Sequence, residues 1–490
     1  MRVMRSPSRS VAARAAVPNS TPAPTAALVP DPAGSTGPTI LLCALFLVIF
    51  LPADLNFASF VNVNTASEPD HSAANKIIWI AALLGSCWYI ASRQRLWFAL
   101  LRTLNPFYLL FIAVAILSII WSIDAPTTVH FVFRVVVIWL CCTAFTLNGW
   151  TADRFPSVMR SLLGALLVGS IIFALVLPQY GIQQFPDYAP ATGGAFNFSG
   201  VGGPVGFQPV LRGLTYSKNQ IGPLAGFGVI FWFHAWLEKR AKVLWTLVCG
   251  GGALICLYWA HSSTSILATA FAIVVMLMLR HWPQWLRRYM PHIVTIFSLL
   301  IFVYSLVILK LIPQLEFLLT PITALTGKDL TFTNRTLIWQ LVAEHIVKHP
   351  LLGTGYSAYW VNADTPGSAG DVFKERLGFY PGSSHNGYLD VLNDLGVVGS
   401  ILLFGYIVTC LRQSLKIMAF DRGQGSLYLA LLFYTFWSSM SESHWFSAGS
   451  DLFTVFTLSV CAAARTLLQH RFEIDSVRAP RRVAPTGRTA

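Results

Sequence analysis

The chain is built from long apolar runs separated by short polar connections, and this pattern constrains its fold more than any other feature. About twelve runs are long enough to cross a hydrocarbon core of ~30 Å as helices. With 55% hydrophobic and only 11% charged residues, the composition is that of a membrane protein and excludes a soluble globular one. We therefore expect an all-α polytopic membrane protein with about twelve transmembrane helices. The expected spans are 39–55, 76–92, 106–123, 127–147, 157–177, 220–237, 242–260, 262–279, 292–311, 391–411, 426–440 and 450–468.

The placement of Lys and Arg predicts the orientation of these spans. Basic residues gather in every second connection, and cytoplasmic connections are enriched in Lys and Arg. Both termini are therefore expected in the cytoplasm, and a large polar loop, 312–389, between the ninth and tenth spans is expected outside. The net charge of +13 follows from this bias. We interpret it as a topology signal and expect no nucleic-acid binding, since no folded basic module is present. The basic connections are 93–102, 154–160, 239–242, 280–288 and 412–422, together with the two ends of the chain.

Both ends of the chain have compositions that cannot form a packed core. Residues 1–37 are rich in Pro, Ala, Ser and Thr with scattered Arg, and residues 471–490 form a basic tail. We expect both segments to be disordered, leaving 38–470 as one membrane domain. The first apolar run has no small-residue cleavage site, so we expect an uncleaved anchor.

No motif in the sequence predicts a nucleotide, a metal or another cofactor. The eight cysteines all lie within apolar runs, without the spacing of a metal site. P-loop, dinucleotide-binding, acyl-transfer and HExxH patterns are absent from the sequence. The energy for any reaction is therefore expected to come from the substrate.

The first half of the large loop contains a predicted helix. Thr333 or Asn334 can cap a helix from Arg335 to about Lys348, which His349-Pro350 would end. Arg335 and Trp339 are one turn apart, so a guanidinium and an indole share a face near the helix N-terminus, where an anion is favoured. The alternative is an interfacial arginine packed on a tryptophan.

The second half of the loop ends in Ser383-Ser384-His385-Asn386-Gly387, directly before the tenth span. The positive end of a helix disfavours imidazolium, so a neutral His385 can accept a proton as a general base. The alternative is a histidine that caps the helix or lies on the surface.

A second outward segment, 181–222, supplies two cations. Arg212 and Lys218 precede a span on the same side of the membrane as Arg335, and together they can clamp a diphosphate. The alternative, strongest for Lys218, is that these side chains reach toward lipid headgroups. Arg134, in the middle of the span 127–147, needs a partner or a water-filled cavity that the sequence does not identify.

The order of these motifs resembles the superfamily of O-antigen ligases and Wzy-type polysaccharide polymerases, over roughly Thr39 to Leu468. The last loop and the helix after it are the most specific part. The Lys218-Asn219 pair and the run 356–360 resemble the exopolysaccharide-production polymerase branch. The motifs that carry the resemblance are Trp121-Ser-Ile-Asp-Ala-Pro126, Arg212-Gly213, Ser217-Lys218-Asn219, Asn334-Arg335 with Trp339, His349-Pro-Leu-Leu-Gly-Thr-Gly-Tyr356, His385-Asn-Gly-Tyr-Leu389 and Leu395-Gly-Val-Val-Gly399.

The resemblance implies a GT-C-like, metal-independent, inverting glycosyltransferase of the bacterial inner membrane. Its donor would be an undecaprenyl-diphosphate-linked glycan, polymerised with a glycan acceptor at the periplasmic face, with chain-length regulators and flippases as further candidate partners. Arg212, Lys218 and Arg335 would neutralise the leaving diphosphate, and His385 would deprotonate the acceptor hydroxyl. The remaining candidate substrate contacts are Asn219, Trp339, Tyr356 and Asn386.

The sequence departs from the family pattern at two positions and leaves alternative functions open. Asn334 stands where a glycine often precedes the arginine, and Ser217 where a histidine often precedes the Lys-Asn pair, so His385 is the one base we predict. A ligase that moves the glycan to lipid A core or to a protein would use the same donor. A flippase or solute transporter would also have many spans, but with ionisable residues distributed within them.

Overall fold

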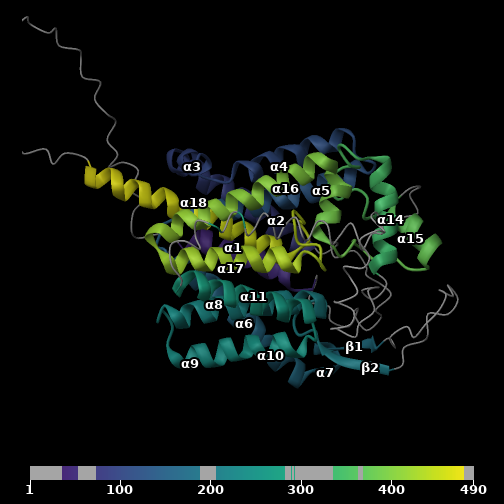
Figure 1. Ribbon diagram of the computed structural model, residues 1–490, viewed down its shortest axis with the longest axis horizontal. Helices are drawn as coiled ribbons and strands as arrows, with labels where there is room; N and C mark the ends of the chain where they lie inside the picture. The colour runs from purple at the N-terminus through teal and green to yellow at the C-terminus, as the bar shows by residue number, and fades with distance from the viewer. Residues whose placement is uncertain are drawn as a thin grey trace, which may run out of the picture.

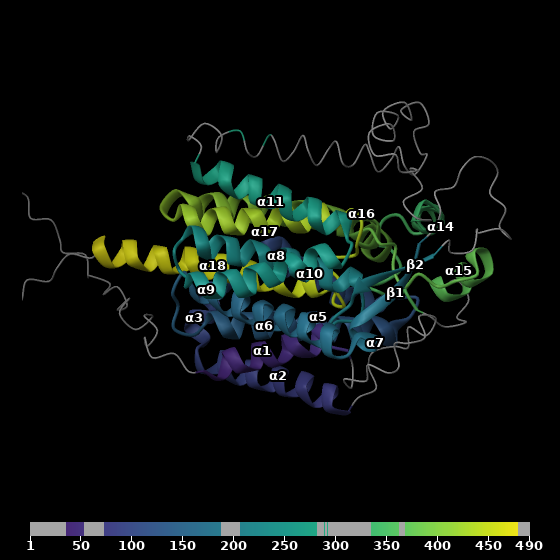
Figure 2. The same cartoon turned by 90° about the horizontal axis from the view of Figure 1, so that it is seen from below.

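The computed structural model describes residues 36–52, 73–187, 206–281, 289, 292, 335–361 and 368–478. These residues form a bundle of long helices that run along a common direction (Figures 1 and 2). The helices α14 and α15 and the strands β1 and β2 lie at one end of the bundle. The short helices α3 and α9 and the C-terminal end of α18 lie at the other.

The bounds of the elements follow the apolar runs closely. The helices are α1 (Gly37–Phe50), α2 (Ala73–Ser92), α3 (Gln94–Leu101), α4 (Pro106–Leu117), the 3₁₀ turn η4 (Ser118–Ile120), α5 (Ala125–Thr146), α6 (Arg154–Val176), α7 (Pro178–Gly181), α8 (Lys218–Leu237), α9 (Val243–Trp245), the π-helical turn η5 (Thr246–Gly250), α10 (Gly251–Trp259), α11 (Ser263–His281), α14 (Arg335–Lys348), α15 (Ala369–Leu377), α16 (Gly387–Phe420), α17 (Arg422–Ser438) and α18 (Asp451–Arg478). The strands are β1 (Ile182–Asp187) and β2 (Gly206–Leu211).

The expected membrane character is confirmed, whereas the number of spans stays a prediction. Within the described residues, five helices are long and apolar enough to cross a membrane, or six if the bent pair α3 and α4 forms one span. Eleven of the expected spans coincide with helical segments, but some of these segments are short, as in α1 with 14 residues. The expected ninth span, 292–311, lies almost entirely outside the described residues.

The two ends of the bundle agree with the alternation of charge in the sequence. The basic connections 93–102 and 239–242 adjoin α3 and α9 at one end, and the loop helices α14 and α15 lie at the opposite end (Figure 2). Which end faces the cytoplasm stays a prediction.

The expectation of a purely α-helical fold is wrong in one segment. Strands β1 and β2 pair antiparallel, with Ile182 opposite Leu211 and Asp187 opposite Gly206. Both strands contain a proline, Pro186 and Pro209, which a two-stranded ribbon tolerates because each strand has one unpaired edge. The high Gly and Pro content of the segment hid the short β-forming stretches.

The expected boundary of the C-terminal tail at residue 471 is also wrong, because α18 continues to Arg478. Its last turns contain no Gly or Pro. The Gln469 side chain donates to Glu473 at 3.3 Å, one turn later, and the ring of His470 stacks on Phe420 at 3.8 Å. These contacts extend the helix beyond its apolar part.

Helix α18 forms the centre of the bundle. In the most apolar 18-residue stretch of α18, 94% of the residues are buried, whereas in the corresponding stretch of α11 only 39% are buried. A helix that is buried on every side is surrounded by other helices, and Figure 1 shows α18 between α16 and α17. The N-terminus of this central helix therefore opens toward the end of the bundle that carries α14 and α15.

Helix α16 is broken inside the bundle, and part of the large loop fills the break. At Gly396 the backbone has φ +62° and ψ −156°. The N–H groups of residues 397–398 donate to the carbonyls of residues 350–351 at 2.9 and 3.2 Å, and those of residues 354–355 donate to the carbonyls of residues 393–394 at 3.3 and 3.0 Å. An interrupted helix at membrane depth needs such partners for its freed backbone groups.

Glycine is required at this break for steric reasons. A Cβ at Gly396 would lie 2.4 Å from the carbonyl group of Leu351, and one at Gly353 would lie 2.4 Å from the carbonyl group of Asp394. Both glycines also have positive φ, where a side chain is strained. The segment Gly353-Thr354-Gly355 is therefore a packed structural segment that fixes α16 and, with it, the N-terminal residues of that helix.

Candidate active site

Helix α14 has the bounds predicted from the sequence, Arg335–Lys348, and its proposed cap at Thr333 or Asn334 lies outside the described residues. Its first two turns hold two different segments. The Arg335 guanidinium donates to the carbonyl of Ser441. The Trp339 indole N–H donates to the carbonyl of Ser384 at 2.8 Å. Helix α14 therefore lies against both the turn that contains His385 and the connection between α17 and α18.

The turn before α16 places His385 in a defined position. The Asn386 side chain caps the helix, accepting from the N–H groups of Tyr388 and Leu389 at 3.1 and 3.3 Å. The Ser384 hydroxyl donates to the Asn386 carbonyl at 2.8 Å. His385, between them, has φ +51°, a strained conformation for a residue other than glycine. The role of Asn386 in this structure is that of a helix cap, and a contact with substrate stays a prediction.

Gly387 brings the His385 turn against the connection between α17 and α18. Its N–H donates to the carbonyls of Ser439 and Glu442 at 2.8 and 3.1 Å. A Cβ at this position would lie 3.0 Å from the backbone nitrogen of Trp445. Only glycine permits this approach without a shift of the neighbouring backbone, and the approach brings Glu442 next to His385.

Glu442 joins the two residues that the sequence singled out in the large loop. One carboxylate oxygen, Oε1, lies 2.9 Å from Nη2 of Arg335, and the other, Oε2, lies 3.0 Å from Nδ1 of His385. The Glu442 side chain is only 17% exposed, so its bonds to Arg335 and His385 are largely shielded from water. Arg335 and His385 thus belong to one cluster, as a common site requires.

The charge of Glu442 is fixed by its neighbours. Burial alone would raise the pKa of this carboxyl, but the charge and hydrogen bond of His385 and the charge of Arg335 outweigh burial and lower the pKa to about 2. An ionised Glu442 accepts the Nδ1–H of His385, and this bond leaves Nε2 as the basic nitrogen. A carboxylate that sets the tautomer of a histidine in this way is the arrangement used in catalytic triads.

His444, two residues after Glu442, cannot take the same role. Its Nδ1 bonds the hydroxyl of Ser450 at 2.9 Å and its Nε2 bonds that of Ser438 at 3.0 Å. Burial lowers the pKa of His444 to about 4. Both nitrogens are engaged, so His444 ties the end of α17 to the start of α18.

Lys218 lies close enough to the cluster to interact with it electrostatically. It occupies the first turn of α8, ahead of the predicted span 220–237. Burial and the charge of Arg335 lower the pKa of Lys218 to about 8, while the charge of Glu442 acts in the opposite direction. Lys218 and Arg335 therefore form a pair of cations near the same carboxylate.

Along the sequence, Arg212 precedes Lys218 and Asn219 directly follows it. Arg212 follows β2, is 5% exposed, and has a lowered pKa because it is buried. The Thr215 hydroxyl donates to the Arg212 carbonyl at 2.8 Å and holds this turn. Asn219 lines a cavity described below. The diphosphate contact of Arg212 and the substrate contact of Asn219 stay predictions.

Two aromatic residues predicted to contact substrate are buried and contact other parts of the protein. Trp339 is 4% exposed and Tyr356 is 2% exposed. The Tyr356 hydroxyl donates to the carbonyl of Phe446 at 2.5 Å and accepts from the N–H of Ala448 at 3.1 Å. Its ring lines the same cavity as Asn219, so any contact with substrate would use the ring face. For Trp339, a substrate contact stays a prediction.

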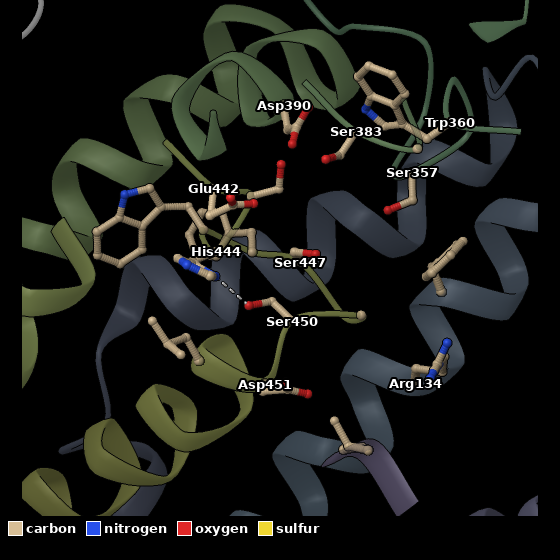
Figure 3. Close-up of a pocket in the computed structure, with 18 of the residues that line it drawn as sticks. Arg134, Ser357, Trp360, Ser383, Asp390, Glu442, His444, Ser447, Ser450 and Asp451 are labelled. Carbon is tan, nitrogen blue, oxygen red and sulfur yellow. Dashed lines mark hydrogen bonds between the residues drawn. The ribbon is translucent and has the colours of Figure 1, made fainter. Parts of the chain in front are cut away.

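A cavity of about 450 Å³ lies beside the cluster, within the range of sites that bind small molecules. Glu442 lies on its wall (Figure 3), together with side chains from α1, α2, α5, α8, α16 and α18. Figure 3 also shows Asp390 and Trp360 on one side of the cavity, with Asp451 and Arg134 on the other. Arg134, whose surroundings the sequence left open, therefore lines a cavity inside the bundle.

The structure adds Glu442 and the acidic wall of the cavity to the residues found in the sequence. The sequence signal for Glu442 was weak: an acidic residue in a short outward connection, with no local motif around it. Within the described residues, no group of three or more His, Cys, Asp or Glu side chains is arranged to hold a metal ion.

The helices and the site define a multi-pass membrane protein with a partly buried cluster of Arg, Glu and His at one end of its bundle. Residues 250–404 match the family model described as O-antigen ligase. The exopolysaccharide production protein ExoQ of Rhizobium meliloti (strain 1021) is 33% identical over 234 residues, which is 45% of this chain and 52% of that protein. The chain thus aligns with about half the length of this curated relative. Over these residues the chain is similar to O-antigen ligases and to an exopolysaccharide production protein, the resemblance that the motif order indicated.

Proposed function

We propose that the protein is a membrane glycosyltransferase that polymerises undecaprenyl-diphosphate-linked oligosaccharide repeats at the periplasmic face of the inner membrane. The observation that carries this proposal is the bridge from Arg335 through Glu442 to His385, with Lys218 nearby. It combines a base with cations suited to a diphosphate. ExoQ is named as an exopolysaccharide production protein, which supports polymerisation as the reaction.

In this mechanism His385 is the general base. Nε2 takes the proton of an acceptor hydroxyl while the hydroxyl oxygen attacks the anomeric carbon of the donor. A new C–O bond forms, and the bond from that carbon to the diphosphate oxygen breaks on the opposite face, so the configuration is inverted. Glu442 stabilises the imidazolium that forms and holds the ring in place.

The cations neutralise the leaving group. The electron pair of the broken bond goes to the undecaprenyl diphosphate, whose negative charge increases as it leaves. A guanidinium has five N–H donors, so the bonds of Arg335 to Ser441 and Glu442 leave donors for phosphate oxygens. Lys218 and Arg212 supply two further charges. The proton on His385 then passes to the diphosphate or to water, and the mechanism uses no metal ion.

A ligase is the second candidate, favoured by the match of residues 250–404 to the O-antigen ligase model. The donor, the base and the cations would be the same. The acceptor would then be lipid A core or a protein instead of another repeat unit.

Proteoliposomes that contain lipid-linked repeat units test this proposal through the length of the product. Wild type is compared with His385→Ala and with His349→Ala, an exposed histidine of the same loop. We expect wild type and His349→Ala to make long polymer, also in EDTA, and His385→Ala to be slower by ~10²–10⁴-fold. Polymer made at the wild-type rate by folded His385→Ala would refute the base. Transfer of glycan only to a lipid A core acceptor would select the ligase.

A further inference from the structure

The wall of the cavity beside Glu442 differs in its chemistry from the cationic cluster. Four carboxylates lie on it, from Asp390, Asp394, Glu442 and Asp451, and Arg134 is the one Lys or Arg side chain among the described residues that line it. Arg335, Lys218 and Arg212 lie outside this lining. Apart from Arg134, the wall offers a diphosphate no cation among the described residues, so the cavity fits a ligand without phosphate.

The chemistry of the wall suits a sugar. Carboxyl groups form hydrogen bonds with hydroxyl groups, as acceptors or, when protonated, also as donors. The rings of Trp360 and Tyr356 add flat apolar surfaces, against which the C–H face of a sugar ring can pack. A wall of carboxylates and aromatic rings therefore matches a neutral molecule with many hydroxyl groups.

Two of the carboxylates are held by the protein through known bonds. Asp394 accepts from the Ser357 N–H at 2.9 Å through one oxygen and from the Asn393 amide at 3.3 Å through the other. Asp390 accepts from the Ser384 N–H at 3.1 Å through Oδ1. We therefore regard Asp394 as a structural residue of the wall.

Asp451 differs from the other carboxylates. It is 6% exposed, and within the described part of the chain its Oδ1 accepts no hydrogen bond. A buried acceptor of this kind is costly unless a ligand or water satisfies it. Gln220 and Arg134 lie near Asp451 and interact with its carboxyl group. The Arg134 guanidinium itself lies 5.2 Å from the centre of the Trp79 ring.

We propose that this cavity binds the terminal sugar of the acceptor glycan, with Asp451 and Trp360 as the residues that select it. The inference rests on the proposed function. Glu442 belongs both to the cavity wall and to the bridge with His385, so a sugar in the cavity lies beside the carboxylate that orients the base. The sugar of the donor remains attached to the diphosphate and lies on the side of the cations.

Steady-state kinetics with two substrates separate the two sides of the site. A repeat-unit oligosaccharide without lipid or diphosphate is the acceptor, and the lipid-linked repeat is the donor. We expect Asp451→Asn and Trp360→Ala each to raise the KM for the acceptor about 10-fold or more and to leave the KM for the donor unchanged. Glu375→Gln, an exposed carboxylate of α15, is the matched control and should change neither constant.

Crosslinking of the wild-type protein tests the same inference without any substitution. The oligosaccharide carries a photoreactive group on its terminal sugar, and the crosslinked peptides are identified by mass spectrometry. We expect crosslinks in residues 356–360 and 442–452. Absence of both crosslinks, or variants that change only the KM for the donor, would overturn the acceptor site. The proposed function would survive that result, because it fails only if His385→Ala retains the wild-type rate.

Discussion

Substitution of Glu442 by glutamine tests the central bridge with almost no change in volume. The two carboxylate oxygens have separate partners: Oε1 faces Nη2 of Arg335 at 2.9 Å and Oε2 faces Nδ1 of His385 at 3.0 Å. A glutamine has one oxygen and one NH₂ group for these two places. If its oxygen accepts from Arg335, its NH₂ group faces His385.

This arrangement forces the wrong tautomer of the base. An NH₂ group beside Nδ1 makes that nitrogen an acceptor, so the proton of neutral His385 moves to Nε2, which then has no lone pair for the acceptor hydroxyl. The opposite orientation of the amide would place its NH₂ group against the donors of Arg335. We therefore expect kcat to fall by ~10²–10⁴-fold, or about 3–5 kcal/mol of transition-state stabilisation.

The assay is the rate of polymer formation in proteoliposomes at saturating donor and acceptor. Glu344→Gln is the matched control, because Glu344 is an exposed carboxylate of α14 paired with Arg376 at 2.9 Å, and such pairs contribute little. Thermal unfolding in detergent checks that both variants are folded. A folded Glu442→Gln protein with more than one tenth of the wild-type kcat would refute the role of Glu442 as the residue that orients the base.

Three further predictions follow from single contacts. Gly387→Ala should lower Tm and activity together, because the new Cβ would lie 3.0 Å from the backbone nitrogen of Trp445, which costs about 1–3 kcal/mol of stability. Gly251→Ala is the control for Tm, because a Cβ at Gly251 would have no neighbour within 4 Å. Burial lowers the pKa of His444 from 6.5 to about 4. Neutral His444 therefore contributes about 3 kcal/mol to the free energy of unfolding above pH 6.5, and this contribution is lost as the pH falls toward 4. Over this pH range, Tm should fall less steeply in His444→Asn than in wild type. The pKa of Lys218, lowered to about 8, predicts that the KM for the donor rises above pH 8 in wild type but not in Lys218→Arg, and parallel rises in both proteins would contradict this role.

The positions of the helices could be predicted from the sequence because apolar runs and caps are local signals. The helix Arg335–Lys348 follows from the helix-forming residues after Asn334 and the proline at 350, and the structure has these bounds. The strands β1 and β2 were missed because a two-stranded ribbon depends on pairing between segments, which Ile182 and Leu211 make across the intervening residues.

Glu442 could not be assigned from the sequence because its two contacts are distant along the chain. It lies 57 residues from His385 and 107 residues from Arg335. Several other acidic residues, such as Asp124, occupy similar outward connections. Asp124 caps α5 by accepting from the Thr127 N–H at 3.1 Å, and no local pattern distinguishes a capping acid from one that orients a histidine.

The motifs of the large loop divide into two physical roles. The segment 349–356 satisfies the broken backbone of α16 around Gly396, and its last residue, Tyr356, is bonded to the connection before α18. The segment 385–389 begins α16 and places the base. Substitution of Gly353 in the first segment, where a Cβ would meet the carbonyl of Asp394, would therefore lower activity through the position of α16 and would also lower stability.

The contacts that align the base with its carboxylate are made by the main chain. The Gly387 N–H bonds the carbonyls of Ser439 and Glu442 at 2.8 and 3.1 Å, and these bonds do not involve the side chains of His385 or Glu442. Removal of either side chain should therefore leave the backbone of the other in place. For this reason the kinetic effects of Glu442→Gln and His385→Ala report on chemistry, and because the two side chains act as one unit, the double variant should be little slower than His385→Ala alone.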